Sequence, residues 1–244
     1  MAMVDSSVGG KTGVNFEGAK NLIGAFYAPE LVYISIDTLK TLPEEQFSSG
    51  MAEAIKHGLI RDEEFFRFLI HNKDKITACN KRFNDNAPLI NHLIGRSIEI
   101  KAEIVSADEK ESGIREILNF GHTFGHSIES LLEYKAPHGY CVGIGMGMAL
   151  NLSAAKGYIE PDVTQKYKCL CDTLNIPTKL SDIGATLNPD DIYSNMLRDK
   201  KARNGKARLV LLRQVGEAFV SELCEKSEVV KSVEAECLYQ FSIN

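Results

Sequence analysis

The chain has 244 residues, of which 44% are hydrophobic, and 28 basic against 33 acidic residues give a net charge of −5. This composition is typical of a folded globular chain and excludes intrinsic disorder, collagen-like repeats and a disulfide-knot scaffold. The acidic balance argues against a nucleic-acid partner, and no apolar run is long enough to predict a membrane partner. Six scattered cysteines without a C-x-x-C pair, and a start without a basic and apolar leader, favour a cytoplasmic protein.

The first 42 residues are rich in glycine and contain short β-type runs, the clearest at 31–36. This pattern predicts loops and strands. Because a stable sheet needs about three or more covered strands, the segment 1–42 is too short to form one alone. We therefore interpret it as the trailing edge of a larger unit.

From Pro43 onward the pattern is helical, and Pro43 suits the first turn of a helix. One long helix is predicted to start near Pro88, because its apolar positions recur in steps of four and three. Further helices are expected over 114–134, 139–156 and between Pro161 and Pro177, followed by a strand at 208–213 and a closing helix at 229–241. The fold prediction is a mainly α domain at 43–244 that carries a β-rich segment at 1–42.

The sharpest chemical pattern combines Arg115, Asn119, His122 and His126, which step by four, three and four. On a single helix this spacing places all four side chains on one face. Polar stripes are usually solvated, but those consist mainly of Lys, Glu and Gln. Two histidines with an arginine and an asparagine favour a lined pocket instead.

A third histidine, His138, follows a short turn, so it can fold back toward His122. Neutral imidazoles and one carboxylate form a common catalytic zinc set. Glu53 is the candidate carboxylate, although an ordinary ion pair with Lys56, three residues away, explains it equally well. Spacing alone leaves both interpretations open.

Three charged residues elsewhere have a structural and a functional interpretation. Lys101 lies on the apolar stripe of its helix, so it either extends to solvent or contacts an anion. Glu111 precedes Arg115 by four residues, which fits an ion pair or a positioned acid–base group. Lys11 follows a double glycine that could meet a phosphate, but Asp5 stands where a Walker loop requires glycine.

Several segments together resemble the 3-dehydroquinate synthase family, in its order and at its spacing over nearly the whole chain. The matching segments are MVDSSVGGKTGVN at 3–15, GAKNLIGAFY at 18–27, GMAEAIK at 50–56, LNFGHTFGHSIE at 118–129, His138-Gly139 and DKK at 199–201. The long motif at 118–129 is highly specific.

This resemblance implies the helical C-terminal domain of the dehydroquinate-synthase-like fold. It also implies conversion of 3-deoxy-D-arabino-heptulosonate 7-phosphate to 3-dehydroquinate and phosphate, the second step of the shikimate pathway. The expected cofactors are NAD and a divalent metal, Zn²⁺ or Co²⁺, and the expected partners are a sugar phosphate and, for the complete protein, a second copy.

The resemblance also assigns roles to individual residues of this chain. The metal ligands would be Glu53, His122 and His138, and the catalytic residues Glu111, His126 and Lys56. Besides the two histidine ligands, the substrate contacts would be Asp5, Lys11, Asn21, Lys101, Arg115, Asn119, Lys200 and Lys201. NAD would be contacted by Lys20 and by Thr38, Leu39, Lys40 and Thr41.

Family members extend further at the N-terminus, where the main nucleotide-binding half lies. On this comparison the segment 1–42 is the end of that half, and we expect the chain to be an incomplete enzyme that is inactive alone. Alternatives are a related sugar-phosphate cyclase, an iron-dependent alcohol dehydrogenase and a non-catalytic helical metal-binding module. Convergence of Lys11, Lys101 and Arg115 argues against the alcohol dehydrogenase, because such an enzyme binds no substrate phosphate that would need these cations.

Overall fold

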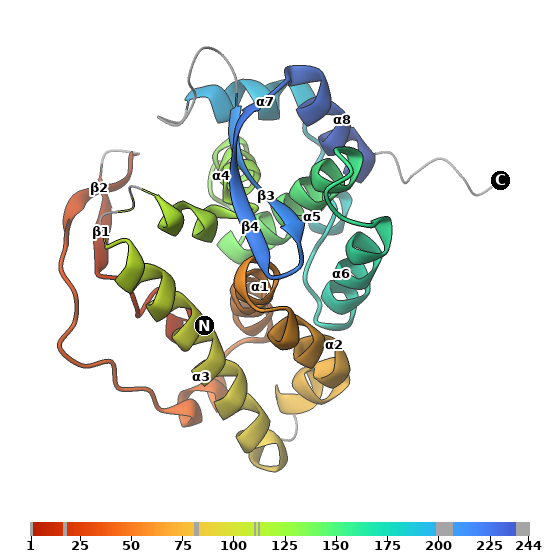
Figure 1. Cartoon of the computed structure of the whole chain (residues 1–244). Coiled ribbons are helices and arrows are strands. Elements are labelled where there is room, and N and C mark those ends of the chain that lie inside the picture. Colours follow the sequence, from red (N-terminus) through yellow and green to blue (C-terminus); the bar gives the residue numbers. More distant parts are fainter. Residues whose placement is uncertain are drawn as a thin grey trace.

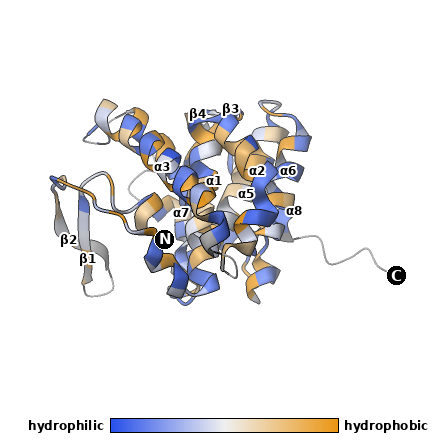
Figure 2. Cartoon of the chain, turned by 90° about the horizontal axis from the view of Figure 1, so that it is seen from below, coloured by the Kyte–Doolittle hydropathy of each residue, from blue (hydrophilic) through white to orange (hydrophobic). Residues whose placement is uncertain are grey.

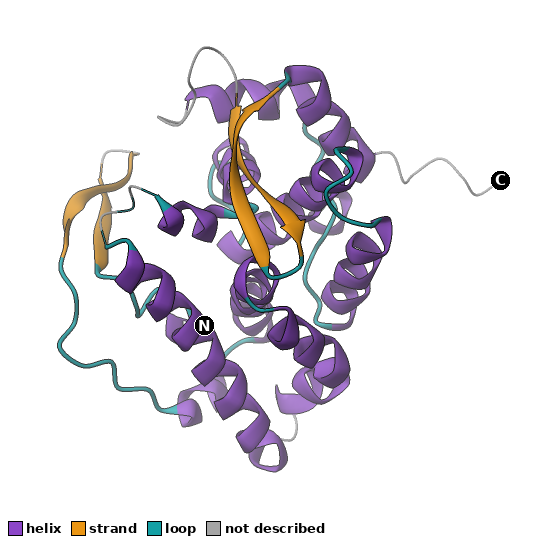
Figure 3. Ribbon diagram, in the orientation of Figure 1, coloured by secondary structure: helices purple, strands orange, loops and turns teal. Residues whose placement is uncertain are grey.

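The computed structural model describes residues 2–16, 19–80, 83–109, 111, 113–198 and 207–237. Helices dominate, and the strands form two separate antiparallel hairpins, as Figure 3 shows. The predicted mainly α fold with a short β segment at the N-terminus is therefore confirmed. Among the described residues, no helix is long and apolar enough to cross a membrane.

The N-terminal hairpin consists of β1 (Lys11–Phe16) and β2 (Ala19–Phe26), and it stands away from the helical body (Figure 2). An extended segment then runs along the outer side of the helices to the short 3₁₀ helix η2 (Ile36–Thr41), as Figure 1 shows. The strand predicted at 31–36 is wrong. Residues 31–35 have no strand partner within the described chain, and Ile36 already belongs to η2.

Helix α1 (Glu44–Arg61) lies at the centre, with residues 50–60 all buried. It is followed by α2 (Glu63–Thr77) and α3 (Phe83–Ala107). Pro43 caps α1 rather than lying in its first turn, and α3 begins at Phe83, before Pro88. The predicted stripe on α3 is confirmed, because its isoleucines and also Ser97 and Lys101 are buried.

The single helix predicted at 114–134 is wrong. The chain forms the 3₁₀ helix η4 (Ile114–Asn119), turns at Phe120 and Gly121, and continues as α4 (His122–Leu131). Gly121 has φ +76°, and a Cβ there would lie 2.5 Å from Met146 Cγ. Contact with the neighbouring helix therefore imposes a left-handed turn that favours glycine. Arg115 and Asn119 thus lie on a different element from His122 and His126.

Helix α5 (His138–Ala155) is buried on nearly all sides and crosses α4 closely. A Cβ at Gly145 would stand 2.2 Å from the backbone oxygen of Gly121, so only glycine permits this approach. The boundaries of α5 agree with the predicted helix at 139–156 to within one residue.

The C-terminal part encloses α5 and α1 with three helices and a hairpin. Its elements are α6 (Pro161–Thr173), α7 (Pro189–Arg198), β3 (Ala207–Gln214), β4 (Glu217–Cys224) and α8 (Lys226–Cys237). β3 confirms the strand predicted at 208–213, whereas β4 was not predicted. The closing helix begins three residues earlier than expected, and its predicted end at 241 lies outside the described residues.

Candidate metal centre

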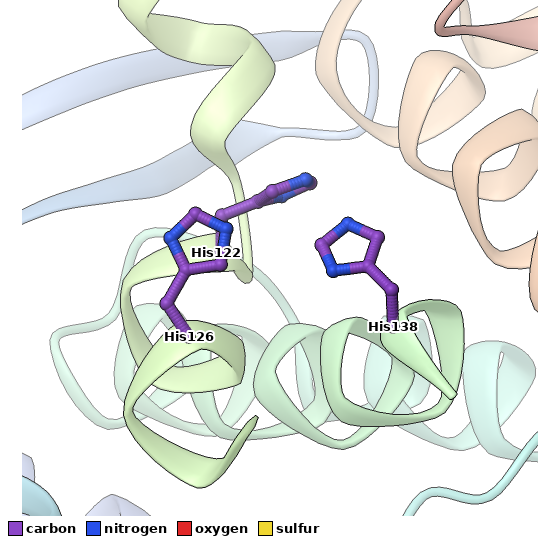
Figure 4. A group of neighbouring side chains, drawn as sticks. All are labelled: His122, His126 and His138. Carbon is purple, nitrogen blue, oxygen red and sulfur yellow. The ribbon is translucent and has the colours of Figure 1, made fainter. Parts of the chain in front are cut away.

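Three histidines meet where α4 and the first turn of α5 face each other. Their ring centroids are 5.3–5.8 Å apart, and one nitrogen of each ring lies within 4.8 Å of the others. Figure 4 shows the rings of His122 and His126 on α4 and that of His138 on α5 around one shared space. The contact between α4 and α5 at Gly145 places these two helices close enough for the cluster to form.

Glu53 reaches the same space from α1. Its Oε1 atom lies 3.4 Å from Nε2 of His122 and 3.4 Å from Nε2 of His138. The structure therefore brings together the three residues expected to hold a metal, from three different helices. His126 stands beside them.

The other ring nitrogens of the two histidines are engaged. His122 Nδ1 lies 3.1 Å from the backbone oxygen of Phe120, and His138 Nδ1 lies 2.9 Å from Glu129 Oε1. Because a carbonyl or carboxylate only accepts, each Nδ1 carries the proton, so Nε2 is the ring nitrogen that can bind a cation on the side of Glu53. Two imidazole lone pairs and one carboxylate are a donor set that suits a zinc-class ion.

Opposite charges dominate the electrostatics of this centre. Burial raises the pKa of Glu53, but Lys56 at 2.6 Å and His122 outweigh it and hold that pKa well below its usual range. Burial lowers the pKa of His122. Burial also disfavours the cationic form of His138, but Glu129 and Glu53 outweigh this effect and raise the pKa of His138 to about 9. Glu53 is therefore ionised at neutral pH, and a metal would have to displace a proton from Nε2 of His138.

A network of ion pairs links the metal centre to the N-terminal segment. Asp5 Oδ1 lies 3.0 Å from Lys101 Nζ, 3.9 Å from Lys56 Nζ and 3.5 Å from His57 Nε2. Burial opposes ionisation of Asp5, but Lys56 and the other cations lower its pKa. Burial lowers the pKa of Lys101 despite Asp5. Asp5, Lys56 and Lys101, all expected site residues, thus lie in one continuous network with Glu53.

A second group surrounds Glu111, which adopts a left-handed conformation with φ +56°. Its carboxylate accepts a hydrogen bond from Asn119 Nδ2 at 2.9 Å and pairs with Lys11. Arg115 is buried and donates to the backbone oxygens of Gly9 and Glu109, at 2.8 and 2.6 Å. The guanidinium therefore holds the glycine turn against the end of α3.

Four of the five expected NAD contacts, Thr38 to Thr41, lie on η2, beside α3 rather than at the histidines (Figure 1). Leu39 is buried in the core, whereas Thr38, Lys40 and Thr41 are exposed. Lys20 and Asn21 belong to β2, but their side chains lie outside the described part of the structure, as do Lys200 and Lys201 entirely.

Glu129 was missed as a site residue. It follows His122 and His126 by seven and three residues, so it continues the same face of α4. Extending the four-and-three spacing by one step would have found it.

Two sequence profiles together match most of the chain. The profile of the 3-dehydroquinate synthase C-terminal family matches residues 50–202, and that of the N-terminal family matches residues 1–49. This chain belongs to the 3-dehydroquinate synthase family. The resemblance inferred from the motifs is thereby confirmed.

Curated members of the family align along nearly all of the chain. A 3-dehydroquinate synthase of Acetivibrio thermocellus is 41% identical over 96% of this chain and 62% of its own length. One of Corynebacterium efficiens is 42% identical, again over 96% of this chain and 62% of its own length. The chain therefore spans about 62% of the length of these relatives.

Solved structures of related cyclases share the fold. A 2-epi-5-epi-valiolone synthase from Streptomyces hygroscopicus, with NAD⁺ and Zn²⁺ bound, has a TM-score of 0.84 and 25% identity, covering 97% of this chain and 63% of that chain. A 2-deoxy-scyllo-inosose synthase, complexed with carbaglucose-6-phosphate, NAD⁺ and Co²⁺, has a TM-score of 0.77 and 25% identity. That match covers 96% of this chain and 64% of the synthase.

Proposed function

We propose that this chain supplies the metal- and substrate-binding part of a 3-dehydroquinate synthase. That enzyme would convert 3-deoxy-D-arabino-heptulosonate 7-phosphate to 3-dehydroquinate and phosphate, with NAD and Zn²⁺ or Co²⁺ as cofactors. The observation that carries the proposal is Glu53 Oε1 at 3.4 Å from Nε2 of both His122 and His138, in a chain of this family.

Glu53, His122 and His138 would hold the metal, which when bound would polarise a substrate hydroxyl. Lys56, 2.6 Å from Glu53 Oε2, keeps that carboxylate ionised. His126 lies beside the ligands, with its ring centroid 5.4 Å from that of His122 and 5.8 Å from that of His138, and its proposed role is to accept and return a proton. Glu111 is the second proposed proton-transfer group, through its carboxylate oxygens.

The cations near the glycine turn are proposed to receive the anionic groups of the sugar phosphate. A Cβ at Gly9 would lie 3.0 Å from Arg115 Nη2 and 3.6 Å from Lys101 Cε, so these two side chains are neighbours. Lys11 approaches the same region through its pair with Glu111. The remaining proposed substrate contacts are Asp5, Asn21, Asn119, Lys200 and Lys201.

We propose the domain division at residue 42, with 1–42 as the end of a nucleotide-binding domain and 43–244 as the helical domain. Among the side chains that the structure describes between 14 and 33, seven large apolar ones are exposed, which is unusual for a free surface and supports a covered position in the whole protein. Lys20 and residues 38–41 are proposed NAD contacts. A cytoplasmic location and a homodimer of the whole protein belong to the same proposal.

The test is phosphate release from 3-deoxy-D-arabino-heptulosonate 7-phosphate with NAD and Zn²⁺. It uses a chimera in which the N-terminal part of the Acetivibrio thermocellus relative precedes this chain. We expect phosphate release by the chimera and its loss in the His122→Ala and His126→Ala variants, while His71→Ala, on the exposed face of α2, keeps the rate. Unchanged release by His122→Ala would overturn the proposal.

A second candidate is cyclisation of a different sugar phosphate. It is favoured by the likeness to the valiolone and scyllo-inosose synthases, which share the fold at 25% identity. The same chimera supplied with a series of other hexose and heptose phosphates distinguishes the two candidates. Faster turnover of any of these sugar phosphates than of the heptulosonate would support this second function.

A further inference from the structure

Glu129 is a buried carboxylate that lies next to a proposed metal ligand. Only 4% of the residue is exposed, and its Oε1 accepts the Nδ1 proton of His138 at 2.9 Å. A buried carboxylate is costly unless it is paired, and the ring of His138 pairs with this one. We propose that Glu129 is the positioning residue that orients the His138 ring for metal binding.

The two histidines differ in how they are held. The side chain of His122 is 12% exposed and its Nδ1 faces a backbone oxygen, so both packing and the main chain fix its ring. The side chain of His138 is 40% exposed, so packing restrains it much less. Its orientation therefore depends on the side chain of Glu129.

The hydrogen bond sets two properties of His138. It selects the form with the proton on Nδ1, which leaves Nε2 as the ligand atom on the side of Glu53. The negative carboxylate also increases the electron density of the imidazole and makes it a better donor to a cation. Glu129 comes from α4, two turns after His122, so the same helix supplies one proposed ligand and orients another.

This inference rests on the proposed metal centre, so the test first establishes that centre. Zinc affinity of the chain is measured by competition with a chromophoric chelator, for the wild type and for His122→Ala. Glu129→Leu removes the acceptor, whereas Glu129→Gln keeps an acceptor oxygen without the charge. Glu236→Gln is the matched control, because Glu236 is equally buried but lies on α8 beside Lys168.

We expect zinc affinity to fall about 10- to 100-fold in Glu129→Leu, and by a smaller factor in Glu129→Gln, because carboxylates behind ligand histidines typically contribute that much. Glu236→Gln should bind zinc within about twofold of the wild type. In NMR spectra of the zinc-loaded chain, the Nδ1 proton of His138 should exchange slowly in the wild type and in Glu129→Gln, and rapidly in Glu129→Leu.

Two outcomes would overturn the inference in distinguishable ways. Wild-type zinc affinity in both Glu129 variants, together with a loss in His122→Ala, would leave the metal centre intact and make Glu129 only a buried core residue. Equal affinity of the wild type and His122→Ala would overturn the metal centre itself. If Glu129→Leu fails to fold, the Gln variant decides, because wild-type zinc affinity in that variant would then contradict the proposal.

Discussion

Gly139 lies so close to Ser49 that a Cβ carbon on it would stand 2.0 Å from the Ser49 backbone oxygen. The Gly139 amide also donates to Ser49 Oγ at 3.0 Å. Gly139 follows His138, and Ser49 lies one helical turn before Glu53. This contact between α5 and α1 therefore sets how closely the imidazole approaches the carboxylate.

The Gly139→Ala variant should destabilise the chain and weaken its zinc binding together. The added methyl group forces the start of α5 away from α1, and overpacking of this kind costs about 1–3 kcal/mol. Urea unfolding and zinc competition measure the two effects. Gly95→Ala in α3 is the control, because a Cβ there has no neighbour within 4 Å, and it should add up to about 1 kcal/mol of stability. Equal stability and equal zinc affinity of the two variants would contradict the prediction.

Replacing His122 by alanine should remove the bound zinc. The substitution deletes an imidazole donor that belongs both to the proposed set with Glu53 and His138 and to the cluster of three histidines, so the site loses a ligand. Elemental analysis after purification with added zinc gives the metal content per chain. His71→Ala, on an exposed position of α2, should retain the wild-type content. Equal zinc in all three proteins would show that these residues bind no metal.

Asp62 should contribute a pH-dependent part of the stability. It caps α2 through the Phe65 amide at 2.9 Å and pairs with Arg96 at 2.6 Å. Burial raises the pKa of Asp62, but these two contacts outweigh it and lower that pKa. The contribution is therefore present above the unfolded-state pKa of about 3.9 and is lost as the pH falls through the lower folded-state value.

We expect Asp62→Ala to lower the free energy of unfolding by about 0.5–2 kcal/mol at pH 7, as measured by urea unfolding. Asp62→Asn keeps a capping acceptor but loses the ion pair, so it should lose less, about 0.2–1 kcal/mol. The difference in the free energy of unfolding between the wild type and Asp62→Ala should narrow below about pH 4. A difference that stays constant down to pH 3 would contradict the role of the carboxylate.

The chain by itself should associate with other copies at rising concentration. Its N-terminal hairpin and the segment after it expose a group of large apolar side chains, including Leu31 at 79% and Tyr33 at 87%. Exposed apolar side chains in such number favour contact with another surface. Sedimentation velocity should show the association weakened in a Leu31→Ser and Tyr33→Ser double variant. Tyr134→Asn is the control, because Tyr134 is exposed and its own φ of +58° is one that asparagine tolerates, and this variant should associate like the wild type.

Local sequence patterns predicted three elements reliably. α3 shows an apolar stripe over several turns, whereas α5 and β3 are nearly continuous apolar runs. The β4 strand was missed because it is recognisable mainly as the partner of β3. The strand at 31–36 was predicted from composition, but a strand forms only when a neighbour pairs with it.

The break at Gly121 shows a limit of local patterns. The spacing from Arg115 to His126 fits one helix, yet the close contact with Met146 requires a left-handed residue in the middle. The histidines still reach the same space as His138, because α4 and α5 pack together at glycines. Their convergence therefore depends on packing, not on the single helix face from which it was predicted.

The sequence by itself determined the family and the mainly helical fold, and it supplied the residue types of the proposed metal centre, because those follow from motifs and local periodicity. Only the tertiary structure decided that Glu53 lies equally far from His122 and His138, and that Glu129 holds the His138 ring. These relations join residues on different helices. The distance between helices is set by the side chains, and above all by the glycines, at their contacts, and no spacing along one helix encodes it.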